Sequence, residues 1–248
     1  MINLVTRGDD IGMCESANRG VLDAFRNGCM RNISVMATGP ALAHAAELLA
    51  KVPGLCVGMH VALNCEWVHP RWGNVLPAAR APSLCKPDGT QFETPNMLHD
   101  RGFSVDEAMA EIAAQLARIR AHGFHVSYVD QHMGVGWIQG LRQPLTEFCN
   151  REGLIDGDAL VHGIPGKGDP LDRLADAPGG TYVLVGHPCL PEADLMDFVL
   201  PGQQRGDTAR DRDRQRLMFS DARLMARIAA GRVRPISYVE AAAKAAKA

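Results

Sequence analysis

The 248 residues carry 26 basic and 28 acidic side chains, a formal charge of -2, and 46% of them are hydrophobic. A chain of this length can bury the core of one large α/β domain, so we expect a single domain over residues 1–248. The balanced charge, without a basic stripe, argues against nucleic-acid binding. Aromatic residues make up only 5% of the chain, which favours a small or medium-sized substrate.

Seven cysteines are spread along the chain, and no two have the two-residue separation of a zinc ribbon or redox motif. We therefore expect reduced, mostly buried thiols. The first residues run directly into an apolar strand without a charged leader, and no apolar run approaches the ~20 residues that cross a bilayer. These features predict a cytoplasmic protein that does not enter membranes. A homodimer is compatible with the sequence.

Apolar runs alternate with amphipathic segments along the chain. We expect strands over residues 2–6, 32–37, 55–61, 124–129, 159–162 and 182–185. We expect helices over residues 14–27, 40–51, 104–123, 142–152, 207–230 and 239–248. The clearest helix begins at Ser104, with Glu107 placed to complete a capping box, and stops at Gly123. Strands separated by helices predict a parallel sheet with helices outside it.

A stretch from residue 64 to residue 103 is rich in proline, glycine and tryptophan and has no clear periodicity. A loop of this length within a compact domain usually has a function, such as a lid or binding insert. The pattern therefore predicts an α/β barrel-like fold with a long insert after the third strand. A doubly wound open sheet would also gather its strand ends, but only near its switch point.

Charged or polar clusters fall at the carboxyl ends of four expected strands: Asp9-Asp10, His60, Asp130 with His132, and His187. In an α/β barrel these ends share one mouth, where active sites lie. Two adjacent carboxylates suit a division of roles, one on a metal and one as a base. Two histidines and a carboxylate form a known facial metal-binding set. Asp130 would orient His132, as carboxylates orient metal-bound imidazoles.

Each of these residues also has a purely structural interpretation. The paired acids could form a turn and a helix N-cap, and His60 could be a buried core residue. His187 could be a loop residue beside Pro188, or a general acid, since the usual pKa of histidine lies near neutrality. The tryptophans could be walls for a sugar or anchors of the core. The charge run over residues 207–216 predicts a solvated helix face with an arginine that could face the substrate.

Six short motifs carry a further signal: Arg7-Gly8-Asp9-Asp10-Ile11-Gly12, Asn18-Arg19-Gly20-Val21-Leu22, Asn32-Ile33-Ser34-Val35-Met36 followed by Gly39-Pro40, Val57-Gly58-Met59-His60-Val61-Ala62-Leu63-Asn64, Val129-Asp130-Gln131-His132-Met133 and Gly186-His187-Pro188. In this order they resemble the YdjC-like carbohydrate deacetylases, which include chitooligosaccharide deacetylases. The resemblance covers nearly the whole chain and implies a distorted or incomplete TIM-type barrel. It also implies one divalent metal held by Asp10, His60 and His132, with Asp9 as general base and His187 near the leaving group.

The chain departs from that family's pattern in two places. Members often have asparagine and alanine where this chain has Arg7-Gly8, and further histidines where it has Tyr128 and Gly134. The three metal-ligating positions survive these changes. The departures leave room for an acylated amine other than a sugar.

We therefore expect a metal-dependent hydrolase that removes an acetyl or other acyl group from an amide, with Asp9 taking the proton of a metal-activated water. The expected substrate is a small acylated amine or an N-acetylated mono- or oligosaccharide, contacted by Arg7, Trp67, Trp72 and Trp137. Zinc suits the ligand set best, and magnesium, manganese or nickel are compatible with it. Two alternatives use the same ligands: a non-haem iron oxygenase and a non-catalytic metal-dependent sugar-binding protein.

Overall fold

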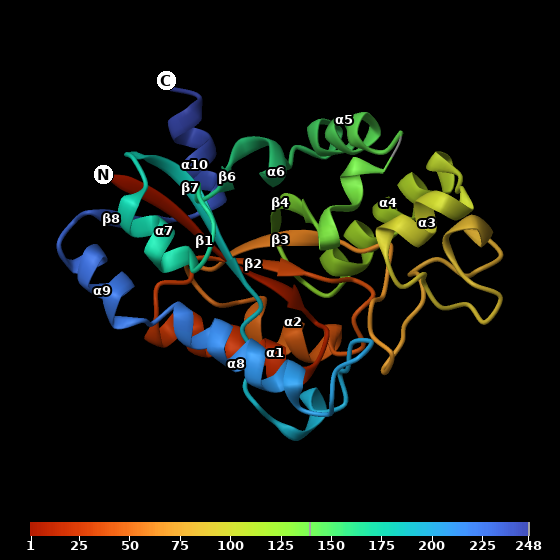
Figure 1. Cartoon of the computed structure of the whole chain (residues 1–248). Helices are drawn as coiled ribbons and strands as arrows, with labels where there is room; N and C mark the ends of the chain where they lie inside the picture. Colours follow the sequence, from red (N-terminus) through yellow and green to blue (C-terminus); the bar gives the residue numbers. More distant parts are fainter. Residues whose placement is uncertain (139, 248) are drawn as a thin grey trace.

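The computed structural model describes residues 1–138 and 140–247, and Figure 1 shows their arrangement. The described strands form one eight-stranded sheet in the order β5-β4-β3-β2-β1-β7-β6, with β8 also paired to β1. All of these pairs are parallel. The strands are β1 (Ile2–Ile11), β2 (Asn32–Val35), β3 (Cys56–Val61), β4 (Val126–Gln131), β5 (Ile155–Asp156), β6 (His162–Gly163), β7 (Gly180–Gly186) and β8 (Val233–Ile236).

Helices cover the outside of this curled sheet, with α1, α2 and α8 below it and α5 and α6 above it in Figure 1. The helices are α1 (Glu15–Asn27), α2 (Leu42–Leu49), α3 (Pro95–Arg101), α4 (Val105–Ala121), α5 (Arg142–Glu152), α6 (Gly157–Leu160), α7 (Pro170–Asp176), α8 (Asp207–Met218), α9 (Ala222–Ala229) and α10 (Tyr238–Ala245). Three 3-10 segments are η1 (Pro82–Leu84), η2 (His132–Trp137) and η3 (Ala193–Leu195). None of the helices in the described ranges is both long and apolar enough to cross a bilayer.

The order of the sheet confirms the predicted fold class. Parallel strands alternate with outer helices, and the strip runs from β5 at one edge to β6 at the other, so the barrel is incomplete. Parallel sheets need cover on both faces, and their strands are correspondingly apolar. The core strands supply fully buried side chains such as Leu4, Ile33 and Met59.

The expected boundaries hold closely for α1, α5 and β3 and less well elsewhere. β1 extends to Ile11, so the paired acids lie in the strand and not after it. Pro40 precedes α2, which begins at Leu42. The capping box at Ser104 is only half formed: its hydroxyl accepts from the amide of Glu107, whereas the Glu107 carboxylate accepts from Ser83.

Two expected elements are wrong. The expected strand over residues 159–162 is half helix: residues 159 and 160 end the short helix α6, where Asp156 accepts a hydrogen bond from the amide of Ala159, and only His162 belongs to a strand, β6. The expected helix over residues 207–230 is two helices, α8 and α9. The chain turns between them, where Phe219 is fully buried and the Asp221 side chain caps α9.

Other elements went unexpected because their sequence signals are weak or contradictory. β8 contains Pro235, which normally argues against a strand, but β8 lies off the main strand order and pairs with β1. The helices α3 and α7 are each seven residues long and start at a proline. The expected tail helix is α10, and Ala248, its expected last residue, lies outside the described residues.

The long insert is an irregular segment, residues 62–94, between β3 and α3. It contains η1 and is fixed by side chains from α4. The fully buried Glu111 carboxylate accepts hydrogen bonds from the amides of Val75 and Leu76 at 2.8 Å each. Gln115 donates to the carbonyl of Ala62 at 2.8 Å. Because buried backbone amides need partners, these side chains replace the ladder that a regular element would provide.

Candidate active site

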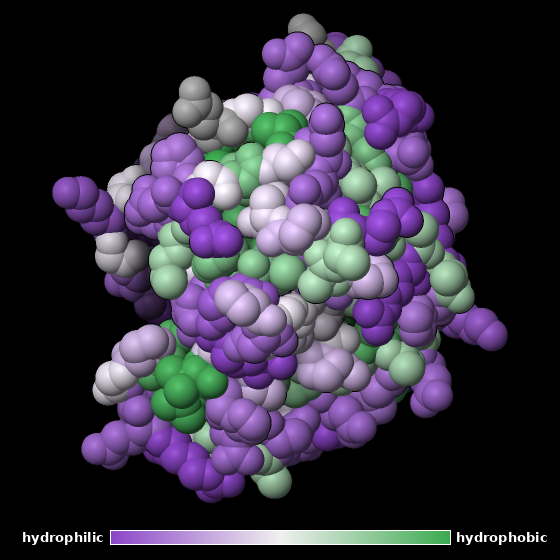
Figure 2. Space-filling view, turned by 90° about the vertical axis from the view of Figure 1, so that its right-hand side faces the viewer, coloured by the Kyte–Doolittle hydropathy of each residue, from purple (hydrophilic) through white to green (hydrophobic). Residues whose placement is uncertain are grey.

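A pocket of about 390 Å³ opens at the carboxyl ends of the strands. It is lined by Asp9, Asp10, His60, Glu66, Gln131, His132, Met133, His187, Leu200 and Arg212. Four strand ends far apart in the sequence therefore meet at one site, as the sequence predicts. Figure 2 views the molecule from the right-hand side of Figure 1, toward which β1 points, and this face is mainly hydrophilic with separate apolar patches.

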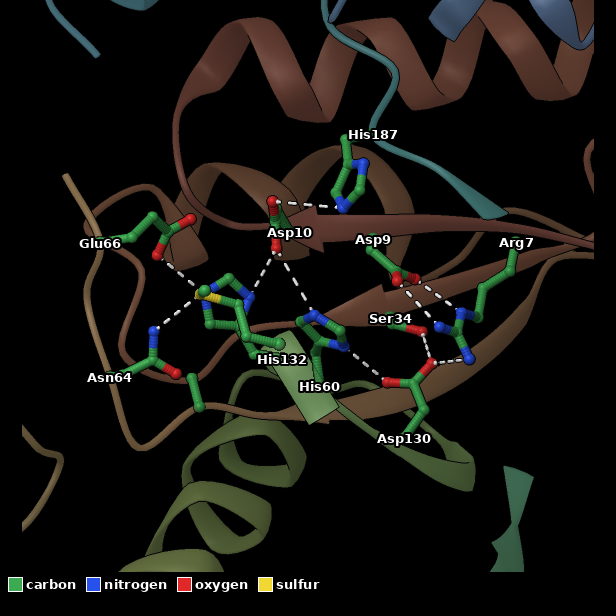
Figure 3. A network of polar contacts seen from close by, with 12 residues as sticks. Arg7, Asp9, Asp10, Ser34, His60, Asn64, Glu66, Asp130, His132 and His187 are labelled. Atoms are coloured by element: carbon green, nitrogen blue, oxygen red, sulfur yellow. Dashed lines mark hydrogen bonds and ion pairs between the residues drawn. The ribbon is translucent and has the colours of Figure 1, made fainter. Parts of the chain in front are cut away.

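The centre of the pocket is a carboxylate between two imidazoles (Figure 3). Asp10 Oδ1 lies 3.1 Å from His132 Nδ1 and 3.5 Å from His60 Nε2. One ligand atom from each residue lies within 4.8 Å of the others, and the three side chains are at most 4% exposed. Buried polar atoms converging in this way could hold a metal ion, and their chemistry suits a divalent cation.

The backbone at Asp10 explains how two consecutive acids reach the same pocket. Successive side chains of a regular strand point to opposite faces of the sheet. Asp10 has a φ of +62°, and the pairing of β1 with β2 shifts register between Gly8 and Ile11. A local irregularity of this kind re-aims a side chain, and aspartate is among the residues that tolerate positive φ. Asp9 and Asp10 therefore both line the pocket.

Asp130 orients a histidine, but it is His60 and not the expected His132. His60 and Asp130 are direct neighbours in the β3–β4 register, and His60 Nδ1 lies 2.6 Å from Asp130 Oδ1. The other carboxylate oxygen accepts from Ser34 at 2.5 Å and pairs with Arg7 at 2.8 Å. Burial alone would raise the pKa of Asp130, but Arg7 and His60 hold it below its usual value.

Asp9 is held by a fork of two hydrogen bonds from Arg7. The guanidinium donates at 2.7 and 2.9 Å to the two carboxylate oxygens. It also donates to the Tyr238 hydroxyl at 2.8 Å, and the whole Arg7 side chain is buried. Neither Asp9 nor Asp10 caps a helix, because Cys14 holds the N-cap position of α1, so the N-cap interpretation of the paired acids is wrong. Arg7 thus faces Asp9 and Asp130, and the expectation that it contacts substrate is corrected.

His132 meets a second carboxylate that the sequence did not single out. Its Nε2 lies 2.9 Å from Glu66 Oε2, on the side opposite the Nδ1 that faces Asp10. Burial would lower the pKa of His132, but the carboxylates of Glu66 and Asp10 raise it to about 9. Glu66 belongs to the insert, six residues after the histidine that β3 presents. That proximity in sequence is the one signal that could have marked it.

His187 and Arg212 also line the pocket. His187 follows β7, its Nδ1 lies 2.8 Å from Gln215 Oε1, and its Nε2 lies 3.9 Å from Asp10 Oδ2. Burial and the Arg212 charge lower the pKa of His187. Arg212 on α8 approaches Asp10 Oδ2 at 3.4 Å. The sequence predicts that an arginine of the charge run over residues 207–216 could face the substrate, but it does not identify that arginine as Arg212.

The three tryptophans separate into two groups. Trp67 and Trp72 are 1% and 7% exposed and belong to a core cluster that joins the insert to residues such as Met36 and Phe198. The Trp67 ring meets Phe198 edge-on at 5.3 Å, and the Arg212 guanidinium lies 5.8 Å from its centre. These two tryptophans are core anchors, which corrects the expectation that they bind substrate. Trp137 is 54% exposed and remains available to a ligand.

Fold and site together define a class: an α/β barrel-like protein with a candidate metal centre of one carboxylate and two imidazoles at its strand ends. The chain belongs to the YdjC-like protein family, whose family model matches residues 3–162. That match contains Asp9, Asp10, His60 and His132. His187 lies beyond it, as do Arg212 on α8 and Tyr238 on α10.

Curated relatives carry deacetylase names. A carbohydrate deacetylase of Halalkalibacterium halodurans is 30% identical over 133 residues, 53% of this chain and 53% of that protein. A chitooligosaccharide deacetylase of Yersinia pestis (strain Pestoides F) is 31% identical over 156 residues, 61% of this chain and 57% of that protein. The chain thus matches little more than half the length of these relatives.

A solved structure shares the fold over nearly the full length. It comes from Enterococcus faecalis V583 and is described only provisionally as a cellobiose-phosphate cleavage protein. The two structures superpose with a TM-score of 0.79 over 96% of this chain and 98% of the other, at 16% sequence identity. At that identity the likeness supports the architecture alone.

Proposed function

We propose that this protein is a metal-dependent deacetylase that hydrolyses the acetamide of an N-acetylated sugar. The observation that carries the proposal is the arrangement of ligand atoms from Asp10, His60 and His132 within 4.8 Å of one another, beside the separately held carboxylate of Asp9. Membership of the YdjC-like family and the deacetylase names of the curated relatives support the same activity.

The residues present fit one divalent cation. Asp10 offers a carboxylate oxygen, while the two imidazoles each offer one nitrogen and use the other on a carboxylate. This three-ligand set leaves positions open for water and substrate, and zinc is our first choice for it. When bound, the metal would polarise the acyl carbonyl and make water a better nucleophile at neutral pH.

The side chains of the protein then divide the proton transfers between them. Asp9 would take the proton from the attacking water, and its two hydrogen bonds from Arg7 fix it in one orientation. His187 has Nδ1 tied to Gln215, so its Nε2 faces the pocket, and the imidazole in its protonated form would pass the Nε2 proton to the departing amine. The Arg212 guanidinium stands on the same wall and can donate to the developing oxyanion.

The sugar assignment rests on the relatives and on the pocket mouth. Both relatives are named for carbohydrate substrates, and the face toward which β1 points is mainly hydrophilic. Trp137, exposed at the end of η2, is the aromatic residue we propose for stacking on a sugar ring. The cytoplasmic location and the homodimer stay predictions from the sequence.

Release of acetate from N-acetylated mono- and disaccharides tests this function. Zinc-loaded protein should release acetate, and protein stripped with a chelator should do so only after zinc is restored. The absence of acetate from the whole panel, with zinc bound, would contradict the deacetylase. Turnover that needs iron and molecular oxygen would instead identify an oxygenase built on the same ligands.

A further inference from the structure

Each imidazole of the candidate metal centre uses its second nitrogen on a carboxylate. His60 faces Asp10 with Nε2 and Asp130 with Nδ1. His132 has the reverse orientation, with Nδ1 toward Asp10 and Nε2 toward Glu66. A carboxylate behind a ligating imidazole selects its tautomer and fixes its ring, which strengthens metal binding. The two pairs differ in origin, because Asp130 lies on a strand whereas Glu66 lies in the insert.

We propose that Glu66 is a positioning residue that holds His132 ready for metal binding, so that the insert is part of the metal site. The inference rests on the proposed function, because it assumes that the three ligand residues bind a metal. With a metal bound, Glu66 would accept the Nε2–H, which leaves Nδ1, on the side that faces Asp10, as the ligating nitrogen. Glu66 is not itself a member of that ligand group, because it approaches His132 from the other side of the ring.

The neighbours of Glu66 keep its backbone in place. Asn64 donates to the carbonyl of Glu93 at 3.3 Å, and the amide of Cys65 donates to the carbonyl of Phe92 at 2.8 Å. On the other side Trp67 is 1% exposed and is packed into the core cluster. A carboxylate fixed between two anchored neighbours can hold an imidazole without a large loss of its own conformational entropy.

The segment from residue 64 to residue 67 also contacts other parts of the pocket wall. The Asn64 amide lies 3.0 Å from the sulfur of Met133, next to His132, and the Trp67 ring lies beneath the Arg212 guanidinium. Figure 3 shows Asn64 and Glu66 on the same side of His132. This part of the insert therefore acts as a brace between η2, which follows β4, and α8, and this role differs from the lid or binding insert that its composition suggested.

Zinc affinity measured by isothermal titration calorimetry tests the proposal. Glu66→Ala should bind zinc about 10- to 100-fold more weakly than the parent protein. Glu66→Gln should recover most of that loss, because its amide oxygen can still accept the Nε2–H. Glu47→Gln, on the exposed face of α2, is the matched control and should bind like the parent.

A cobalt-loaded sample separates positioning from a folding defect. The visible absorption bands of bound cobalt report its ligands, so Glu66→Ala should shift them, whereas partial unfolding would lower them without a shift. Zinc affinity of Glu66→Ala within about twofold of the parent, with unshifted cobalt bands, would overturn the positioning role and leave the deacetylase proposal intact. A parent protein that binds no zinc would instead overturn the metal centre itself.

Discussion

The carboxyl ends of β1, β3 and β4, here called the sheet edge, and the insert meet at the same pocket but fix their residues by different means. At the sheet edge, the register of parallel strands places His60 beside Asp130. In the insert, the backbone is irregular, and buried side chains of α4 such as Glu111 satisfy its amides. The comparison teaches that one histidine depends on strand pairing and the other on long-range side-chain contacts.

The largest expected effect at the sheet edge is the loss of catalysis in Asp9→Asn. The variant cannot accept the proton of water, but it leaves Asp10, His60 and His132 unchanged. We expect kcat to fall about 10²- to 10⁴-fold, the usual contribution of a general base, with zinc affinity nearly unchanged. Steady-state kinetics and calorimetry on the same preparation check both parts. Full activity in this variant would remove Asp9 from the reaction.

Truncating the two carboxylates that face the imidazoles compares the regions directly. Asp130→Ala leaves Arg7 and His60 buried without their shared partner, which should cost about 3–5 kcal/mol of unfolding free energy. Glu66→Ala removes one hydrogen bond to His132 near the pocket opening and should cost less, about 1–3 kcal/mol. Urea unfolding of the metal-free proteins measures both values. Equal losses would mean that the insert contributes as much to the fold as the sheet edge does.

Much of the sheet edge could be predicted from the sequence, because a polar residue that interrupts an apolar strand stands out. His60 and the paired acids carry that signal. Glu66 does not, because it lies in an irregular segment, and its closeness to His60 in the sequence does not show that it will face His132 after folding. Arg212 lies among many charged neighbours on α8. A tryptophan such as Trp67 or Trp72 can pack in the core or line a binding site, and only the tertiary packing decides which of the two it does.

The partner of Asp130 was missed for a related reason. The sequence places Asp130 two residues before His132 at the end of one strand, which suggests that they interact. Pairing across strands brings His60 closer, since neighbouring residues in register lie side by side. Local spacing therefore predicted the right residue types and the wrong pair.

Removing the Glu111 carboxylate, which holds the insert, should destabilise the insert and leave the structure of the sheet edge unchanged. Glu111→Ala leaves the half-buried amides of Val75 and Leu76 without their partner, which should cost about 1–3 kcal/mol of stability. Hydrogen exchange should speed up at these two amides and stay slow in β1 and β3. Unchanged exchange at Val75 and Leu76 would show that other contacts hold the insert.

The smallest expected effect is a pH-dependent change in stability at Asp158, which lies 3.8 Å from the Arg7 guanidinium. Burial and the Asp130 charge raise the pKa of Asp158 to about 6. Because the pKa in the folded state exceeds the ordinary value, ionisation of Asp158 disfavours folding, and this penalty grows as pH rises from about 4 to above 6. Because the Asp158 side chain is 38% exposed, solvent screens most of this penalty. Asp158→Asn should therefore raise the melting temperature at pH 8 by only about 1–2 °C and leave it nearly unchanged at pH 4. A gain that is larger at pH 4 than at pH 8 would contradict this assignment.

The central claim is that Asp10, His60 and His132 share one cation. Elemental analysis of zinc-loaded, dialysed protein tests it most directly, with His60→Ala and His132→Ala prepared in parallel. The account predicts about one zinc per chain in the parent protein and none retained in either variant. Stoichiometric zinc in both variants would contradict it.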